Sequence, residues 1–214
     1  MQLYSYFRSS AAYRVRIALN MKGLPYDYLP VHLLKDGGQQ RGESYVNLNP
    51  QGLVPTFVDD GLIIGQSLAT IEYLDETHPE PALLPGSPED RARIRDLALM
   101  VACDIHPINN LRILKYLKHT LQVDDEAKDA WYRHWTEEGL RALESRVAHD
   151  RGTGTYCHGD VPTLADICLV PQMANARRFN CDLSGMPTLV RIDESCRALP
   201  AFEKAAPQNQ PDAE

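Results

Sequence analysis

Four prolines within eleven residues divide this chain into two parts. Residues 78–88 read HPEPALLPGSP. Because proline has no backbone N–H and its ring clashes with the preceding helical turn, such a segment forms neither a helix interior nor a central strand. We therefore predict a linker at residues 81–88, between an N-terminal domain at residues 1–80 and a C-terminal domain at residues 89–214.

The N-terminal part mixes strand patterns with helix patterns. Residues 3–7 form a short run rich in aromatic side chains, which is typical of a buried strand. Apolar residues then recur every three or four positions through residues 11–19, which is the spacing of a helix. The Asp59-Asp60-Gly61 turn indicates a hairpin. We predict an α/β domain with strands at residues 3–7, 26–32, 56–58 and 62–64, and with helices at residues 11–19 and from Ser67 onward.

The C-terminal part contains only helix patterns. Apolar residues follow a helical stripe through residues 89–118, where Pro107 predicts a kink. Thr163 and Asp166 have the spacing of a capping box, in which two side chains satisfy free amide groups at a helix start. We predict an all-helical domain with helices at residues 89–118, 124–148, 163–179 and 187–198, followed by a loose tail at residues 206–214.

The charge and the cysteines argue against several classes of function. The formal net charge is −7 and no run of five basic residues occurs, which opposes binding to nucleic acid or to anionic membranes. The sequence has no signal-peptide pattern and no apolar stretch long enough to cross a membrane, so we expect a cytoplasmic protein. The five cysteines include no Cys-x-x-Cys pair, and the sequence suggests neither a disulfide framework nor a metal site.

The turn after the first predicted strand is the first candidate site. Arg8, Ser9 and Ser10 stand where the apolar period changes from strand to helix. A serine at a helix start can cap the first turn, and the free amide groups of that turn, with Arg8 beside them, attract an anion. Two interpretations stay open, a purely structural cap and an anion-binding turn.

Two later segments could hold a peptide-like ligand. Val54 precedes Pro55 at a strand start, and a cis bond there, the minority form on sequence alone, would leave the Val54 backbone free to pair with an extended ligand. Gln66 and Ser67 open a helix and offer an amide, a hydroxyl and backbone N–H groups, which suit a carboxylate. Simple capping by Ser67 is an equal alternative.

Together these segments resemble the glutathione transferase architecture, a thioredoxin-like α/β domain followed by an all-α domain. The chain is similar in particular to the zeta class of that family. The similarity is carried by RSSAAYRVRIAL at residues 8–19 and by Lys22-Gly23, Asn49-Pro50, Gln66-Ser67-Leu68-Ala69, Leu169-Val170-Pro171-Gln172, Asn175-Ala176, Arg178-Phe179 and Gln210-Pro211-Asp212.

The resemblance implies an enzyme with glutathione as its cofactor. The expected reaction is the cis-trans isomerisation of a maleyl keto acid, either maleylacetoacetate or maleylpyruvate, to the fumaryl isomer in aromatic and tyrosine catabolism. The thiolate would add to the cis double bond, allow rotation and leave again, so glutathione would not be consumed. A homodimer is also implied, and apolar residues in the ranges 68–74 and 97–111 agree with it.

The resemblance gives each site residue a role. Ser9 matches the hydroxyl that stabilises the glutathione thiolate, and Ser10, Arg8 and Arg178 complete the expected catalytic set. The two arginines match residues that receive the substrate's carboxylates, to which a guanidinium can make paired bonds. The expected glutathione-binding residues are Ser9, Ser10, Gln40, Val54, Pro55, Gln66, Ser67 and Asn110, and the expected substrate-binding residues are Arg8, His106, Arg112 and Arg178.

One departure from the family pattern concerns the catalytic turn. Ala11 stands where the family often has cysteine, which removes a thiol and leaves more of the stabilisation of the thiolate to Ser9.

Two other functions fit the residues. One is a glutathione S-transferase that conjugates or dehalogenates small α-halo acids, and the other is a ligand-binding or structural protein that kept only the fold.

Overall fold

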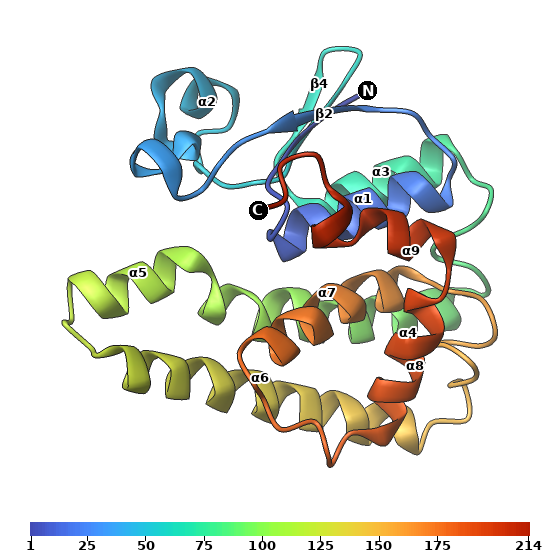
Figure 1. Ribbon diagram of the computed structural model, residues 1–214. Coiled ribbons are helices and arrows are strands. Elements are labelled where there is room, and N and C mark those ends of the chain that lie inside the picture. Colours follow the sequence, from blue (N-terminus) through green and yellow to red (C-terminus); the bar gives the residue numbers. More distant parts are fainter. The chain divides into compact units, whose positions relative to one another are not determined.

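The N-terminal part of the chain folds around a four-stranded mixed sheet in the computed structural model, which describes residues 1–214 (Figure 1). The strand order is β2-β1-β3-β4, in which β1 pairs parallel with β2 and the other two pairings are antiparallel. The strands are β1 (Gln2–Ser5), β2 (Asp27–Pro30), β3 (Thr56–Asp59) and β4 (Leu62–Ile64). The predicted hairpin is confirmed, with both Asp60 and Gly61 at positive φ in its turn.

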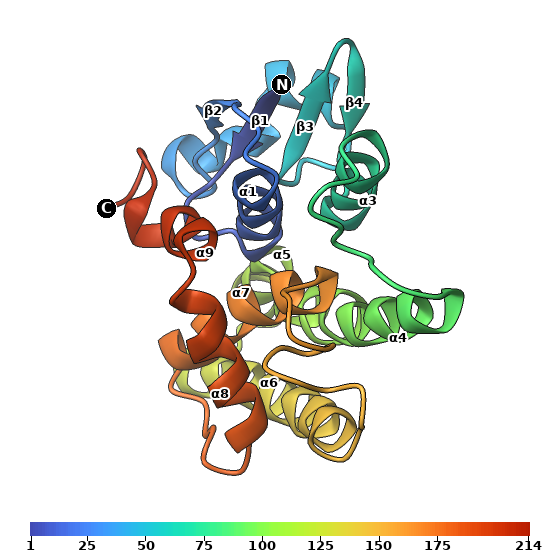
Figure 2. The same ribbon diagram turned by 90° about the vertical axis from the view of Figure 1, so that its right-hand side faces the viewer.

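Two helices cover one face of this sheet (Figure 2). They are α1 (Ser10–Met21) and α3 (Ser67–Thr77), which contact each other. Three short helical segments, η1 (Lys35–Gly37), η2 (Gln39–Arg41) and α2 (Glu43–Leu48), connect β2 to β3. The shared core contains fully buried side chains from both layers: Leu3, Ile17, Leu19, Phe57, Ile71 and Leu74. Burying this apolar surface fixes α1, and with it the turn that precedes α1, against the sheet.

The C-terminal residues also belong to this sheet-containing unit. The chain divides into one compact unit of Met1–Leu83 with Ala198–Glu214 and a second unit of Leu84–Arg197. The structure thus differs from the predicted boundary, which placed residues 198–214 with the helices. The change from the first unit to the second falls between Leu83 and Leu84, inside the predicted linker.

The prediction of a loose tail at residues 206–214 is wrong. Helix α9 (Pro200–Ala205) packs along α1, and the short turn η5 (Pro207–Asn209) follows it. The Gln210 side chain is buried and donates hydrogen bonds to the carbonyls of Lys204 and Ala206, at 2.9 and 2.8 Å. The tail is ordered because its polar groups find partners within this unit, which its polar composition does not reveal.

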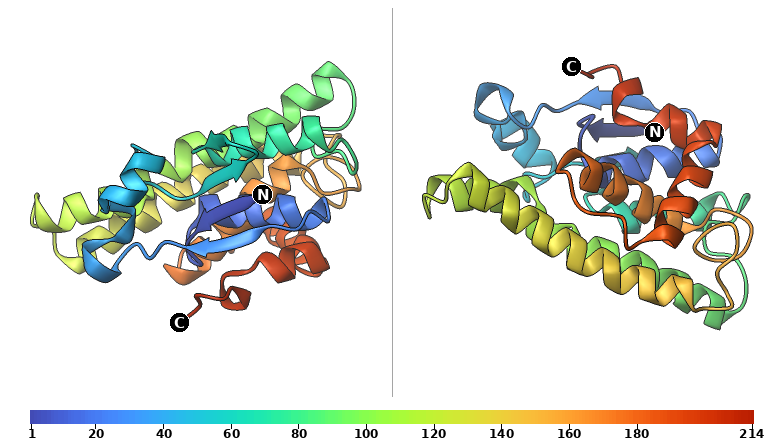
Figure 3. Two further views of the ribbon diagram at one scale, coloured as in Figure 1. Left: turned by 90° about the horizontal axis from the view of Figure 1, so that it is seen from above. Right: turned by 60° about the horizontal axis from the view of Figure 1, so that its bottom comes forward.

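The second unit consists of helices (Figure 3). None of them combines the length and the apolar character that crossing a lipid bilayer requires. Helix α7 contacts α4, α6 and α8 and is the central helix of this unit. The helices are α4 (Pro88–Leu99), α5 (Leu111–His119), α6 (Asp125–Ala148), α7 (Leu164–Arg178) and α8 (Pro187–Arg197).

The single helix predicted at residues 89–118 is interrupted over a longer stretch than Pro107 alone would suggest. A π-helical turn, η3 (Met100–Ile105), follows α4, and a 3-10 turn, η4 (Pro107–Asn109), follows η3. Asn110 then starts α5, because its side chain accepts a hydrogen bond from the Arg112 amide at 3.1 Å. The interruption leaves His106 and Asn110 at segment ends instead of on one helical face.

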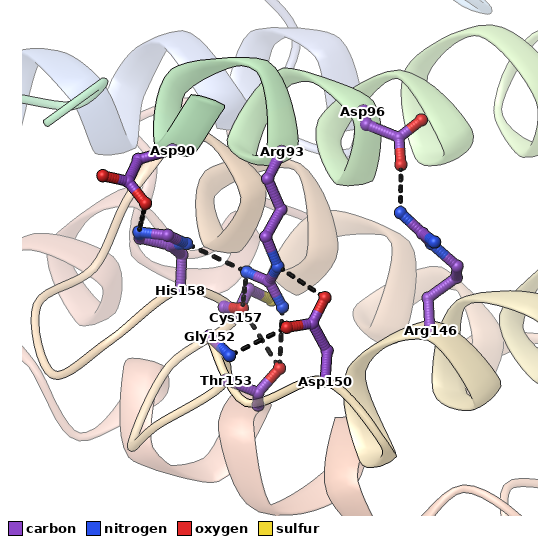
Figure 4. Close-up of polar contacts among 9 residues, drawn as sticks. All are labelled: Asp90, Arg93, Asp96, Arg146, Asp150, Gly152, Thr153, Cys157 and His158. Carbon is purple, nitrogen blue, oxygen red and sulfur yellow. Dashed lines mark hydrogen bonds and ion pairs between the residues drawn. The ribbon is translucent and has the colours of Figure 1, made fainter. Parts of the chain in front are cut away.

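The loop between α6 and α7 is held by one arginine of α4 (Figure 4). The Arg93 guanidinium donates to Asp150 at 2.8 Å, to the Thr153 hydroxyl at 2.9 Å and to the Cys157 carbonyl at 2.8 Å, and it lies 3.0 Å from Nδ1 of His158. These bonds fix the loop that leads into α7, the helix that ends at Arg178.

The capping box predicted at the start of α7 is confirmed. Thr163 and Asp166 are fully buried and satisfy each other's backbone amide groups. The second carboxylate oxygen of Asp166 accepts a bond from the Cys157 amide at 2.8 Å. Burial raises the pKa of Asp166, and the hydrogen bonds from Cys157 and Thr163 oppose that rise.

Candidate active site

Ser9 caps helix α1, as one of the two interpretations of the sequence predicts. It lies in extended backbone, and its Oγ accepts a hydrogen bond from the Ala12 amide at 3.2 Å. Capping uses only an acceptor position of the hydroxyl, so the Ser9 O–H can still donate to an anion in front of the helix. The structural role of Ser9 and a role in anion binding are therefore compatible. Ser10, the first residue of α1, is buried.

Arg8 gives this turn a fixed positive charge. Its side chain is exposed, and its guanidinium lies over the Phe7 ring, 4.8 Å from the ring centre. No acidic side chain forms an ion pair with Arg8. The charge of Arg8, together with the first amide groups of α1 and their dipole, favours an anion next to Ser9.

The Val54-Pro55 peptide bond is cis, the minority form on sequence alone. Asn49 holds the loop before it, because its Nδ2 donates to the Leu53 carbonyl at 3.0 Å and to the Thr56 hydroxyl at 2.9 Å. Asn49 is a buried positioning residue, whereas the sequence shows it only as part of the Asn49-Pro50 match to the family.

The start of α3 differs by one residue from the prediction. Gln66, not Ser67, is the N-cap, because Gln66 has extended backbone and its carbonyl accepts the Thr70 amide at 2.9 Å. The Gln66 side chain does not cap the helix and donates instead to Oε1 of Gln51 at 2.9 Å. The first amide groups of α3 thus have no side-chain acceptor from the cap, which suits a ligand carboxylate.

Gln40 presents a buried acceptor without a partner. Its side chain, on η2, is 6% exposed, and its Oε1 accepts no hydrogen bond. Gly38, at φ 105°, leaves room for it, since a Cβ at that position would lie 2.8 Å from Nε2 of Gln40. An unpaired buried carbonyl oxygen costs about 1–3 kcal/mol. A ligand N–H group would remove that cost.

Four predicted site residues lie in the helical unit. His106 follows the π-helical turn, Asn110 caps α5, and Arg112 is exposed in the first turn of α5. Arg178 is exposed in the last turn of α7. The structure therefore gives Asn110 a definite capping role at the start of α5.

Aromatic rings support Arg178. Its guanidinium lies 4.8 Å from the centre of the Phe179 ring, and Phe179 stacks on Tyr132 with ring centres 3.6 Å apart. Burial raises the pKa of Tyr132 to about 12, and the charge of Arg178 opposes that rise. Arg178, like Arg8, forms no ion pair with an acidic side chain.

Three of the five cysteines are poorly suited to nucleophilic chemistry. Burial raises the pKa of Cys157 and of Cys196, and it raises the pKa of Cys181 to about 11. Since the thiolate is the reactive form, a raised pKa makes these three cysteines weaker nucleophiles near neutral pH.

The four-stranded mixed sheet and the helical second unit agree with the class of protein that the comparisons give. The family model "Glutathione S-transferase, N-terminal domain" matches residues 3–82. The chain is 54% identical to a probable maleylacetoacetate isomerase of Vibrio cholerae, over 99% of this chain and 97% of that protein. It is 48% identical to a solved maleylpyruvate isomerase, described as a bacterial zeta-class glutathione transferase, with a TM-score of 0.97 and 100% of both chains covered.

A third relative was solved with ligands. The maleylacetoacetate isomerase of Anaeromyxobacter dehalogenans has been determined with glutathione bound in its active site, at 45% identity and a TM-score of 0.88, with 100% of this chain and 97% of that chain covered. Another structure of it contains dicarboxyethyl glutathione and citrate, at 43% identity and a TM-score of 0.86 over the same shares. The chain belongs to the zeta class of glutathione transferases, the family of the maleylacetoacetate and maleylpyruvate isomerases.

Proposed function

We propose that this protein is a glutathione-dependent cis-trans isomerase that converts a maleyl keto acid, maleylacetoacetate or maleylpyruvate, to its fumaryl isomer. The observation that carries the proposal is the start of α1, where the Ser9 hydroxyl, free amide groups and Arg8 meet at one turn. The names of the relatives support the reaction, because relatives that match over the whole chain are named as isomerases of these two acids.

Glutathione fits the polar groups of the N-terminal unit. The unpaired Gln40 oxygen suits an N–H donor of a peptide, and the first amide groups of α3 suit a carboxylate. The Val54 backbone, beside Pro55, suits an extended peptide. When bound, glutathione supplies the thiol whose reversible addition permits rotation about the substrate's double bond.

Ser9 and the start of α1 favour the thiolate form of that thiol. A helix N-terminus with a cation beside it lowers a thiol pKa from about 8.5 to about 3.5–7.5, which leaves thiolate at neutral pH. The Ser9 O–H donates to the sulfur, and Arg8 adds its charge. Ser10, as the next residue of the same turn, contributes backbone to the helix start.

Arg8 and Arg178 are proposed to bind the two carboxylates of the substrate. Each guanidinium is held by an aromatic ring and has no acidic partner in the protein. A carboxylate at each end of the substrate would complete both pairs. The dicarboxyethyl glutathione bound by the Anaeromyxobacter relative supports a site that accepts two further carboxyl groups together with glutathione. His106, Asn110 and Arg112 are proposed to act from the helical unit on the same ligands.

The direct test follows the absorbance change of each acid, maleylacetoacetate and maleylpyruvate, with and without glutathione. We expect rapid isomerisation of at least one acid that depends on glutathione. Equal rates with and without glutathione would contradict the proposal. The comparison of the two acids also identifies the preferred chain length.

We further propose that the protein is a cytoplasmic homodimer. Light scattering at micromolar concentration should give about twice the monomer mass of 24.1 kDa, and the monomer mass would contradict the prediction. The apolar residues of α3 give less support than the sequence suggested, because Ile71 and Leu74 are buried within their own unit. Leu99, which is 42% exposed on α4, is the better candidate for an interface residue.

A further inference from the structure

We infer that the C-terminal tail is part of the thiolate site, and that Asp212 is the positioning residue that holds the Phe7-Arg8-Ser9 turn in place. The inference rests on the proposed role of Ser9 and adds a second requirement to it. The tail lies in the same compact unit as the turn, although more than two hundred positions separate Phe7 from Asp212 along the chain.

The Asp212 carboxylate joins the turn to the neighbouring strand. One oxygen accepts a hydrogen bond from the Phe7 amide at 3.1 Å, and the other accepts one from the Tyr28 hydroxyl at 2.5 Å. Phe7 follows the end of β1 and precedes Ser9 by two residues, whereas Tyr28 belongs to β2. Burial and the bond to Asp212 raise the pKa of Tyr28, so its hydroxyl keeps its proton and remains the donor.

Arg16 of α1 holds the same peptide from its carbonyl side. Its guanidinium, fully buried, donates to the carbonyls of Phe7 at 3.0 Å and Tyr6 at 3.4 Å. The Tyr6 carbonyl also accepts the Ser9 amide at 2.9 Å. Side chains therefore bind both the N–H and the C=O of Phe7, which leaves this turn few alternative conformations.

The bonds from Asp212 and the bonds from Arg16 both connect the Phe7 peptide to the C-terminal segment. The Nε of Arg16 donates to the Ala205 carbonyl at 3.0 Å, so the arginine is itself placed by α9. Further along, the buried Gln210 side chain fixes the backbone just before Asp212. At the end of the tail, Glu214 pairs with Lys35 and lies 3.6 Å from Nε2 of His32, and it makes no hydrogen bond to Phe7, Arg8 or Ser9. The tail thus reaches the Ser9 turn with one carboxylate, that of Asp212.

The pKa of the bound glutathione thiol distinguishes a positioning role of Asp212 from an effect of its negative charge alone. If Asp212 positions Ser9, loss of its hydrogen bonds weakens the bond from Ser9 to the sulfur, and the thiol pKa rises toward about 8.5. If Asp212 acts only through its negative charge, removal of that charge lowers the thiol pKa. The two explanations predict opposite signs.

The experiment compares Asp212→Ala, Asp212→Asn and the control Glu214→Gln in the full-length protein. Each variant is titrated with glutathione bound, and the thiolate is followed by its ultraviolet absorbance, alongside kcat, KM and thermal unfolding. We expect Asp212→Ala to raise the thiol pKa and to lower kcat by roughly tenfold, since small misplacements of reacting groups cost up to about a hundredfold. Asp212→Asn should restore most of the loss, because an amide can accept from Phe7 and donate to the Tyr28 oxygen. Glu214→Gln should have the same thiol pKa, kcat and KM as the parent protein.

Two outcomes would overturn the inference: an unchanged thiol pKa in Asp212→Ala, or a lowered pKa in both Asp212 variants. If Asp212→Ala does not fold, Tyr28→Phe is measured in its place. It removes one of the two bonds to Asp212, so it should raise the thiol pKa by less than the loss of both bonds would. An unchanged pKa in that variant would also overturn the inference. The proposed role of Ser9 fails separately if Ser9→Ala retains the thiolate, and the proposed function fails if isomerisation by the parent protein does not depend on glutathione.

Discussion

Ser9→Ala is expected to lower turnover by about 100- to 1,000-fold, the usual effect of removing a hydrogen-bond donor from a developing anion. The reason is that the Ser9 O–H is the donor that the fold places in front of α1, where its Oγ already accepts from Ala12. Steady-state kinetics with saturating glutathione and the diketo acid measures this effect.

Ser87→Ala is the matched control for this substitution. Ser87 caps α4 as Ser9 caps α1, and loss of either cap costs about 1 kcal/mol of stability. Both variants should therefore show a similar shift in urea unfolding, but only Ser9→Ala should lose activity. Full activity of Ser9→Ala together with a loss in Ser10→Ala would move the thiolate-binding role to Ser10.

Arg178→Met is expected to raise the KM for the diketo acid by about tenfold or more, because a hydrogen bond to a charged group contributes about 1.5–3 kcal/mol. Arg8→Met should act in the same direction. A neutral aromatic halide, conjugated by the same thiolate, has no carboxylate for these arginines to bind. Its KM should therefore change much less. The exposed Arg141, which pairs with Glu137 on α6, gives the control Arg141→Met. Equal losses on both substrates would mean that the arginines serve glutathione or the fold.

The parts of the fold that local chemistry specifies could be predicted from the sequence. The change of apolar period at Ser9, the Asp60-Gly61 turn and the Thr163 capping box each act over a few residues, and the structure contains all three. The predicted cap at Ser67 was wrong by one residue, because the Gln66 side chain turns to Gln51 and the helix begins without a side-chain cap.

The supports of the candidate site could not be predicted, because they connect distant parts of the chain. Nothing near Phe7 indicates that its amide binds Asp212, and the polar composition of the tail is typical of a loose end. Arg16 looks like a surface residue in the helical pattern of α1, yet it is fully buried among carbonyl oxygens. The role of Asn49 likewise depends on the folded loop that brings Leu53 and Thr56 to it.

The most direct test of the central claim is a titration of free thiol during turnover. The protein is supplied with a small amount of glutathione and a large excess of the diketo acid, and thiol is measured before and after the substrate is isomerised. An isomerase returns the thiol in every cycle, so the thiol concentration should stay constant while many equivalents of product form. A thiol concentration that falls in step with product would contradict the account and show a conjugating transferase instead.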